Sequence, residues 1–134
     1  MQAPIPCQLD AEDFILRFLH SSRVNPDGSV NSGAFSLRAD PELSVAIEKL
    51  IPAESMERFC ALKIGQGLAK VRVDEIRALG LDARPDKEPE WGDFADAHAV
   101  ITGHAQWSNN RKDEAARALR NAANAWGVVR PPTK

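Results

Sequence analysis

The sequence has 134 residues, which is enough for one ordinary domain with its own hydrophobic core. Its hydrophobic content of 43% and charged content of 27% argue against a disordered chain, and its net charge of −2 argues against a general nucleic-acid coat. No apolar run is long enough for a membrane helix, and the amino terminus lacks a charged-then-apolar signal pattern. The two cysteines, Cys7 and Cys60, fit no zinc spacing and no disulfide framework, so we expect a cytoplasmic protein.

The first third of the chain predicts short strands separated by turns. Residues 1–8 read as a loose arm. Residues 14–19 fit a helix or a buried strand, and we favour a strand because a stretch rich in turn residues follows at once. The Asn-Pro-Asp-Gly sequence at 25–28 predicts a turn, because proline fixes one dihedral angle and glycine accepts a positive one. Residues 34–38 predict a further short strand.

The middle of the chain mixes strand and helix patterns. Residues 43–50 alternate as a strand does, although helical spacing competes with that interpretation. A proline followed by an early glutamate indicates a helix over residues 52–62. Residues 68–73 predict a strand with one apolar face, residues 75–79 a short helix, and residues 81–84 an extended segment.

Residues 85–96 form an acidic segment with prolines, interrupted by Trp91 and Phe94. The favoured interpretation is an ordered surface loop that these two aromatic side chains anchor to the body. The alternative is a loop whose exposed aromatic side chains dock a partner protein. Trp91 and Phe94 are therefore candidate partner-binding residues.

The last third of the chain predicts a strand followed by the clearest helix. Residues 96–104 are the best strand candidate, and residues 111–126 carry an alanine-rich apolar stripe at helical spacing that ends at Gly127. Residues 128–134 read as a second loose arm. Because strands and helices do not alternate regularly, we predict a single α+β domain over residues 1–134. It should contain a small mixed or antiparallel sheet, about three helices, and the carboxy-terminal helix packed on the sheet.

His98 and His104 lie on the same side of the last predicted strand but about 20 Å apart, so they cannot share a metal ion, and we predict no metal site. Asp96 precedes His98 and could orient its imidazole. A histidine beside a carboxylate can act as an acid or base near neutral pH. His98 is thus a candidate catalytic residue, with a structural histidine as the alternative.

Polar residues cluster before and after the 25–28 turn. Arg17 and Arg23 could bind an anion, Ser32 could position it, and His20 is a second candidate catalytic residue. The same residues would suit an ordinary polar surface loop. No complete phosphate-binding glycine motif is present, and no cofactor is predicted.

The predicted carboxy-terminal helix is basic. Arg117 and Arg120, together with Arg111 and Lys112, could form a stripe that contacts phosphates, an acidic partner or a second copy of the chain. The alternative is the ordinary solvated face of an amphipathic helix.

Several short pieces, taken together and in order, run from Arg17 to Gly103. They are Arg17, His20, Asp27, Gly28, Ser32, Ala34, Phe35, then Leu43, Ser44, Val45, then Asp96, Ala97, His98, Ala99, Ile101 and Gly103. In this order and rough spacing they resemble a group of small uncharacterised bacterial proteins. The resemblance implies a bacterial single-domain protein with a shared polar site near His20, Ser32 and His98. It implies no particular activity.

Three functions remain open from the sequence. The slightly favoured one is a binding or accessory module that acts through protein–protein contacts or as a homodimer, because no complete catalytic motif is present. The second is a small enzyme that binds a nucleotide or phosphate-bearing substrate through the Arg/Ser/His residues. The third, which is not favoured, is nucleic-acid binding through the basic helix. Whether the protein is an enzyme is left undecided.

Overall fold

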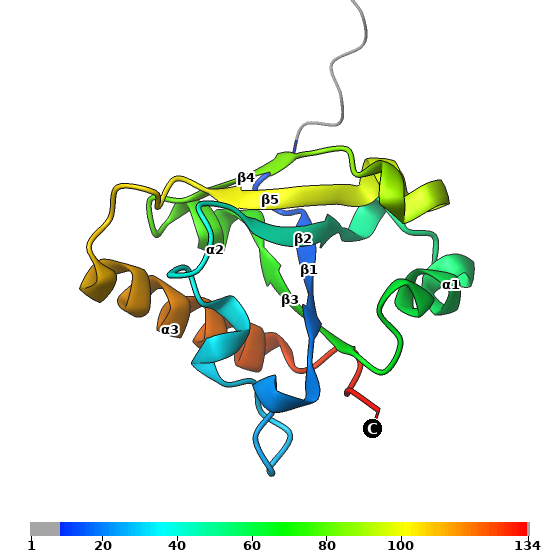
Figure 1. The fold of residues 1–134 in the computed structure, drawn as a ribbon, viewed down its shortest axis with the longest axis horizontal. Coiled ribbons are helices and arrows are strands. Elements are labelled where there is room, and N and C mark those ends of the chain that lie inside the picture. The colour runs from blue at the N-terminus through cyan, green and yellow to red at the C-terminus, as the bar shows by residue number, and fades with distance from the viewer. Residues whose placement is uncertain (1–8, 134) are drawn as a thin grey trace, which may run out of the picture.

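Five antiparallel strands form the centre of the computed structural model, which describes residues 9–133 (Figure 1). Their order across the sheet is β3-β1-β2-β5-β4. The strands are β1 (Phe14–Leu19), β2 (Leu43–Ile47), β3 (Gly67–Arg72), β4 (Asp82–Pro85) and β5 (His98–Thr102). The α-helices are α1 (Met56–Cys60), α2 (Val73–Arg77) and α3 (Asn109–Trp126). The predicted single α+β domain with about three helices is confirmed, and the sheet is antiparallel rather than mixed.

The strand β1 lies inside the sheet, between β3 and β2. Ile15 and Leu19 are buried on the face that α3 covers, whereas Leu16 is buried on the other face. A strand that is covered on both faces has apolar residues at both parities, and a helix can show the same pattern. This explains the ambiguity of residues 14–19, where the favoured strand interpretation is confirmed.

Helix α3 covers one face of the sheet, as predicted (Figure 1). It begins at Ser108, whose hydroxyl accepts a hydrogen bond from the backbone nitrogen of Arg111, and it ends at Gly127 with a positive φ of 87°. Small side chains on its apolar stripe let the helix approach the sheet closely. The buried members of this stripe are Ala115, Ala116, Leu119 and Ala123.

The opposite face of the sheet is packed by aromatic rings. The Phe59 ring of α1 lies 5.1 Å from Phe18, 5.7 Å from Trp91 and 5.5 Å from Phe94. Trp91 and Phe94 come from a bent 3-10 segment, Pro89–Ala97, and are only 9% and 8% exposed. The acidic segment is therefore an ordered loop with aromatic anchors. The alternative, in which these two rings dock a partner, needs exposed rings and disagrees with their burial.

The ladder between β1 and β2 is short, and this opens the sheet at one end. The paired residues are Ile15 with Ile47 and Leu16 with Ala46, and beyond them the two strands separate. Arg17 spans the gap: its Nε donates to the carbonyl of Ala34 at 3.0 Å and its Nη1 to that of Ser44 at 2.8 Å. The guanidinium thus takes the place of the missing ladder bonds at this split.

Two predicted segments differ from the structure. The strand predicted over 34–38 is wrong, because Ser32–Phe35 form a 3-10 turn that begins where the Asn31 side chain accepts a hydrogen bond from Gly33. Residues 128–133 are not a loose arm, since Val129, Arg130 and Thr133 make backbone hydrogen bonds to Leu68 and Gly65. The arm predicted at residues 1–8 lies outside the described residues.

None of the helices between residues 9 and 133 has the length and apolar character needed to cross a lipid bilayer.

Candidate functional site

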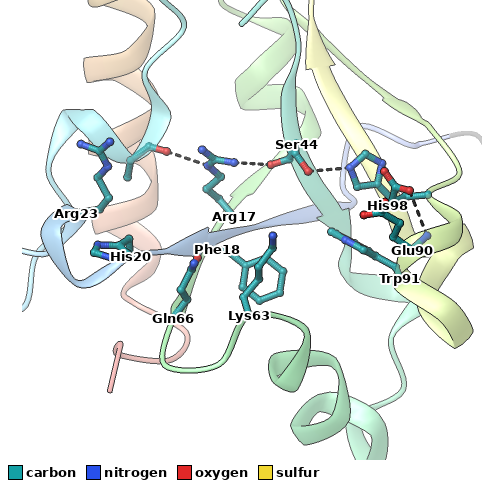
Figure 2. Close-up of a pocket in the computed structure, with 12 residues that line it drawn as sticks. Arg17, Phe18, His20, Arg23, Ser44, Lys63, Gln66, Glu90, Trp91 and His98 are labelled. Carbon is teal, nitrogen blue, oxygen red and sulfur yellow. Dashed lines mark hydrogen bonds between the residues drawn. The ribbon is translucent and has the colours of Figure 1, made fainter. Parts of the chain in front are cut away.

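A pocket of about 410 Å³ opens beside the split between β1 and β2 (Figure 2). Its wall combines residues from three strands with residues from the loops around them. The lining residues are Arg17, Phe18, His20, Arg23, Ala34, Ser44, Lys63, Gln66, Glu88, Glu90, Trp91 and His98.

Arg17 is a partly buried cation in this wall. Its two hydrogen bonds go to backbone carbonyls, and no carboxylate of residues 9–133 forms an ion pair with it. Burial lowers the pKa of the Arg17 guanidinium from its ordinary value, the positive charge of Arg23 lowers it further, and Asp40 opposes this effect. The protein therefore holds a partly buried positive charge at the pocket wall that forms no ion pair within residues 9–133.

Ser44 and His98 meet in the wall of the pocket. They are diagonal neighbours on adjacent strands, since Ser44 pairs with Val100 and His98 pairs with Ala46. The Ser44 hydroxyl oxygen lies 2.7 Å from His98 Nε2. Figure 2 shows Arg17 and His98 on opposite sides of Ser44, one at its carbonyl and the other at its hydroxyl.

The second ring nitrogen of His98 faces Asp86. Its Nδ1 lies 2.5 Å from the Asp86 backbone carbonyl and 3.5 Å from one carboxylate oxygen of the same residue. A carbonyl can only accept, so Nδ1 carries a proton and donates it to this bond. In the neutral ring Nε2 then has the free lone pair, and it accepts the hydrogen bond from Ser44.

The His98 ring is fixed by its surroundings. It is only 6% exposed, and Trp91 packs against it edge to face with 4.7 Å between the ring centroids. Backbone pairing between Asp86 and His98 also ties the end of β4 to the start of β5, which holds the Asp86 carbonyl in place. The imidazole is thus held in one orientation by packing and hydrogen bonds together.

The charged residues are unevenly spread around the pocket. Arg23 and His20 lie at one end with Arg17, whereas Glu90 lies at the other end beside His98 (Figure 2). Lys63 adds a further positive charge at the rim. The arrangement gives the pocket one cationic end and one acidic end.

Four of the five residues predicted for catalysis or anion binding come together here: Arg17, His20, Arg23 and His98. Ser32 does not line this pocket. It lies in a neighbouring hollow of about 290 Å³, together with Arg38, Asp113 and Arg117. His20 is exposed, and its Nδ1 accepts a hydrogen bond from the backbone of Ser22.

The other predicted residues lie elsewhere. Arg117 is exposed on α3, and Arg120 donates to its neighbour Asn121. Arg111 stacks on the Trp107 ring, with 3.7 Å from its guanidinium carbon to the ring centroid. The basic residues of α3 therefore do not all present free positive charge on one face.

His104, at the end of the predicted strand 96–104, is completely buried. Its Nε2 donates to the carbonyl of Asp40 at 2.8 Å, and its Nδ1 has no partner among the described residues. It lines none of the pockets described above, so it takes no part in the site.

Ser44 is the main residue that the sequence interpretation missed as a site residue. The apolar side chains on either side of it, Leu43 and Val45, show that Ser44 faces away from the α3 side. This alternation of apolar and polar side chains is visible in the sequence. The pairing of β2 with β5, which brings His98 to the Ser44 hydroxyl, cannot be predicted from local sequence patterns.

In the described part of the chain, no three His, Cys, Asp or Glu side chains gather as a metal ion would require. The carboxylates nearest to His98 come from the segment around Asp86, not from Asp96, whose side chain is exposed and lies 3.7 Å from the ammonium group of Lys87. Comparisons of the chain with family models, with curated proteins and with solved structures find no match, so the site is interpreted from its own geometry.

Proposed function

We propose that the protein binds a small anionic molecule, carrying a phosphate or a carboxylate group, in the pocket beside the β1–β2 split. The observation that supports this most directly is the partly buried guanidinium of Arg17, which lines the pocket with no ion-pair partner among residues 9–133. Removing a charge from water is costly, and a bound anion would offset that cost.

The neighbours of Arg17 support the same ligand chemistry. Arg23 lies close enough to Arg17 to lower its pKa, so the two like charges repel each other when the pocket has no anion. An anion between them would relieve this repulsion. Guanidinium groups also match the geometry of phosphate and carboxylate oxygens, to which they can donate two hydrogen bonds at once.

The dimensions of the pocket fit a metabolite-sized ligand. Its volume of about 410 Å³ lies inside the usual range for small-molecule sites, about 300–1,000 Å³. Trp91 and Phe18 supply apolar wall beside the charged groups. The binding-module interpretation has less support, because Trp91 and Phe94 are buried, and Arg111, which a nucleic-acid interface would use, stacks on Trp107.

The binding experiment uses Arg23→Ala, because Arg23 lines the pocket and makes no side-chain hydrogen bond or ion pair that the structure records within residues 9–133. Isothermal titration calorimetry with inorganic phosphate and with succinate separates the two anion types. We expect Arg23→Ala to weaken binding about ten-fold or more, as for the loss of a hydrogen bond between charged groups.

The matched control is Arg120→Ala, which removes the same charge from α3 outside the pocket. It should leave the affinity unchanged. Equal losses in both variants would show a general charge effect, and no binding of either anion to the unaltered protein would refute the proposed function.

A further inference from the structure

Resting on the anion-binding function proposed above, we infer that Ser44 and His98 form a nucleophile and general base that cleave a carboxylic ester carrying an anionic group. Ser44 lies between Arg17 on the cationic side and His98 on the other, and Trp91 packs beside the His98 ring (Figure 2). A substrate held by its anion at Arg23 would lie across the Ser44 hydroxyl.

The position of the protons favours this chemistry. Because the Asp86 carbonyl holds the Nδ1 proton, Nε2 faces the Ser44 hydroxyl with a lone pair at 2.7 Å. A serine becomes a useful nucleophile when an adjacent base can take its proton, and a third group orients that base. The Asp86 carboxylate, 3.5 Å from Nδ1, would stabilise the imidazolium that forms.

The exposure of the two partners also points to reactivity. Ser44 is exposed and lines the pocket, whereas the His98 ring is buried and locked against Trp91. Water can satisfy an exposed hydroxyl, so Ser44 does not need a buried imidazole for its own hydrogen bonding. The arrangement instead leaves the oxygen accessible to a ligand while its proton points to a fixed base.

The first half of the reaction follows from these positions. Ser44 Oγ bonds to the ester carbonyl carbon, the carbonyl electron pair moves to its oxygen, and the hydroxyl proton passes to His98 Nε2. Arg17, which donates to the backbone carbonyl of Ser44, supplies the positive charge that would stabilise this oxyanion. The bond from carbon to the alcohol oxygen then breaks, and the alcohol leaves with the proton from Nε2.

Water completes the cycle. Its oxygen bonds to the acyl carbon while its proton passes to His98 Nε2, and the bond to Ser44 Oγ breaks as that oxygen takes the proton back. The products are a carboxylic acid and an alcohol, and nothing is oxidised or reduced.

The test measures labelling and turnover on the full chain. A fluorophosphonate probe should attach to Ser44, which peptide mass spectrometry identifies, with loss of fluoride. The esters 4-nitrophenyl hydrogen succinate and 4-nitrophenyl acetate compare an anionic with a neutral substrate. We expect the anionic ester to react faster, and its advantage to disappear in Arg23→Ala.

Ser44→Ala and His98→Gln should each abolish labelling and lower ester turnover at least about 100-fold, the scale of a lost nucleophile or general base. Both should still bind phosphate in calorimetry. The control is Ser55→Ala, because Ser55 directly precedes α1 and does not line the pocket. This variant should behave as the unaltered protein.

The outcomes separate the two proposals. If the unaltered protein binds phosphate but takes no label, the Ser44–His98 inference is wrong and the anion site stands. If it binds no anion, the anion site fails, whatever the label shows. Should Ser44→Ala lose its fold, as judged by circular dichroism, His98→Gln decides, and labelling at the unaltered rate in that variant overturns the inference.

Discussion

The two faces of the sheet are packed in different ways. Under α3 the core is made of small and aliphatic side chains, such as Ala123 and Leu119, and the helix runs for 18 residues without a break. The opposite face is covered by the short α1 and by the bent segment Pro89–Ala97, which pack rings against Phe59. A long helix of small residues closes its face, whereas short segments with large rings leave one end of theirs open. The pocket lies at that open end.

The largest expected effect tests whether the aromatic face supports the pocket. Phe59→Ala removes the ring that contacts Phe18, Trp91 and Phe94, and Phe18 and Trp91 line the pocket. We expect a loss of about 3–5 kcal/mol in the free energy of unfolding and weaker phosphate binding. Urea denaturation and calorimetry measure the two quantities.

The comparison for that variant is Leu119→Ala on the α3 face, where the side chain is fully buried. It should cost about 2–5 kcal/mol in stability but leave phosphate affinity unchanged in the folded fraction. If both variants alter affinity equally, the two faces are coupled, and the distinction between them fails.

A medium effect tests how closely α3 approaches the sheet. Ala123 is fully buried, so Ala123→Leu forces a larger side chain into the core. We expect this overpacking to lower the free energy of unfolding by about 1–3 kcal/mol. Ala125→Leu, on the exposed side of the same helix, is the matched control and should have little effect. Equal stabilities by urea denaturation would mean that this face has spare room.

The smallest effect concerns an ion pair that ties α3 to the segment before β2. Arg38 donates to both Asp113 oxygens, at 2.8 and 2.5 Å, and this hydrogen bonding lowers the pKa of Asp113 from its ordinary value of 3.8. A carboxyl whose pKa is lower in the folded state adds stability at neutral pH, and this contribution is lost as the pH falls below about 4.

Asp113→Asn should therefore melt at a slightly lower temperature than the unaltered protein at pH 7. The difference should shrink as the pH is lowered through the acidic range. A difference that stays constant from pH 7 to pH 3 would assign the effect to packing rather than to the charge.

Patterns within single elements were enough to predict much of the fold. The apolar stripe and the caps of α3 define that helix, and alternation together with the following turn predicted β1. The 34–38 prediction failed because a local side-chain hydrogen bond of Asn31 outweighed strand propensity. The candidate site needed more, since the Ser44–His98 contact joins residues 54 positions apart and depends on strand register. Arg17 was identified by residue type, but only the three-dimensional structure shows that it forms no ion pair within residues 9–133.

Gly67 shows how the outer edge of the sheet is protected. A side-chain carbon at this position would lie 2.2 Å from the carbonyl oxygen of Arg130 and 2.6 Å from the nitrogen of Pro132, so only glycine lets this segment cross β3 so closely. Val129 and Arg130 bond to Leu68 and occupy hydrogen-bonding groups that an unpaired strand would offer to another chain. The segment therefore protects the β3 edge against pairing with a strand of another chain. The other edge of the sheet is β4, a strand of four residues that ends at Pro85.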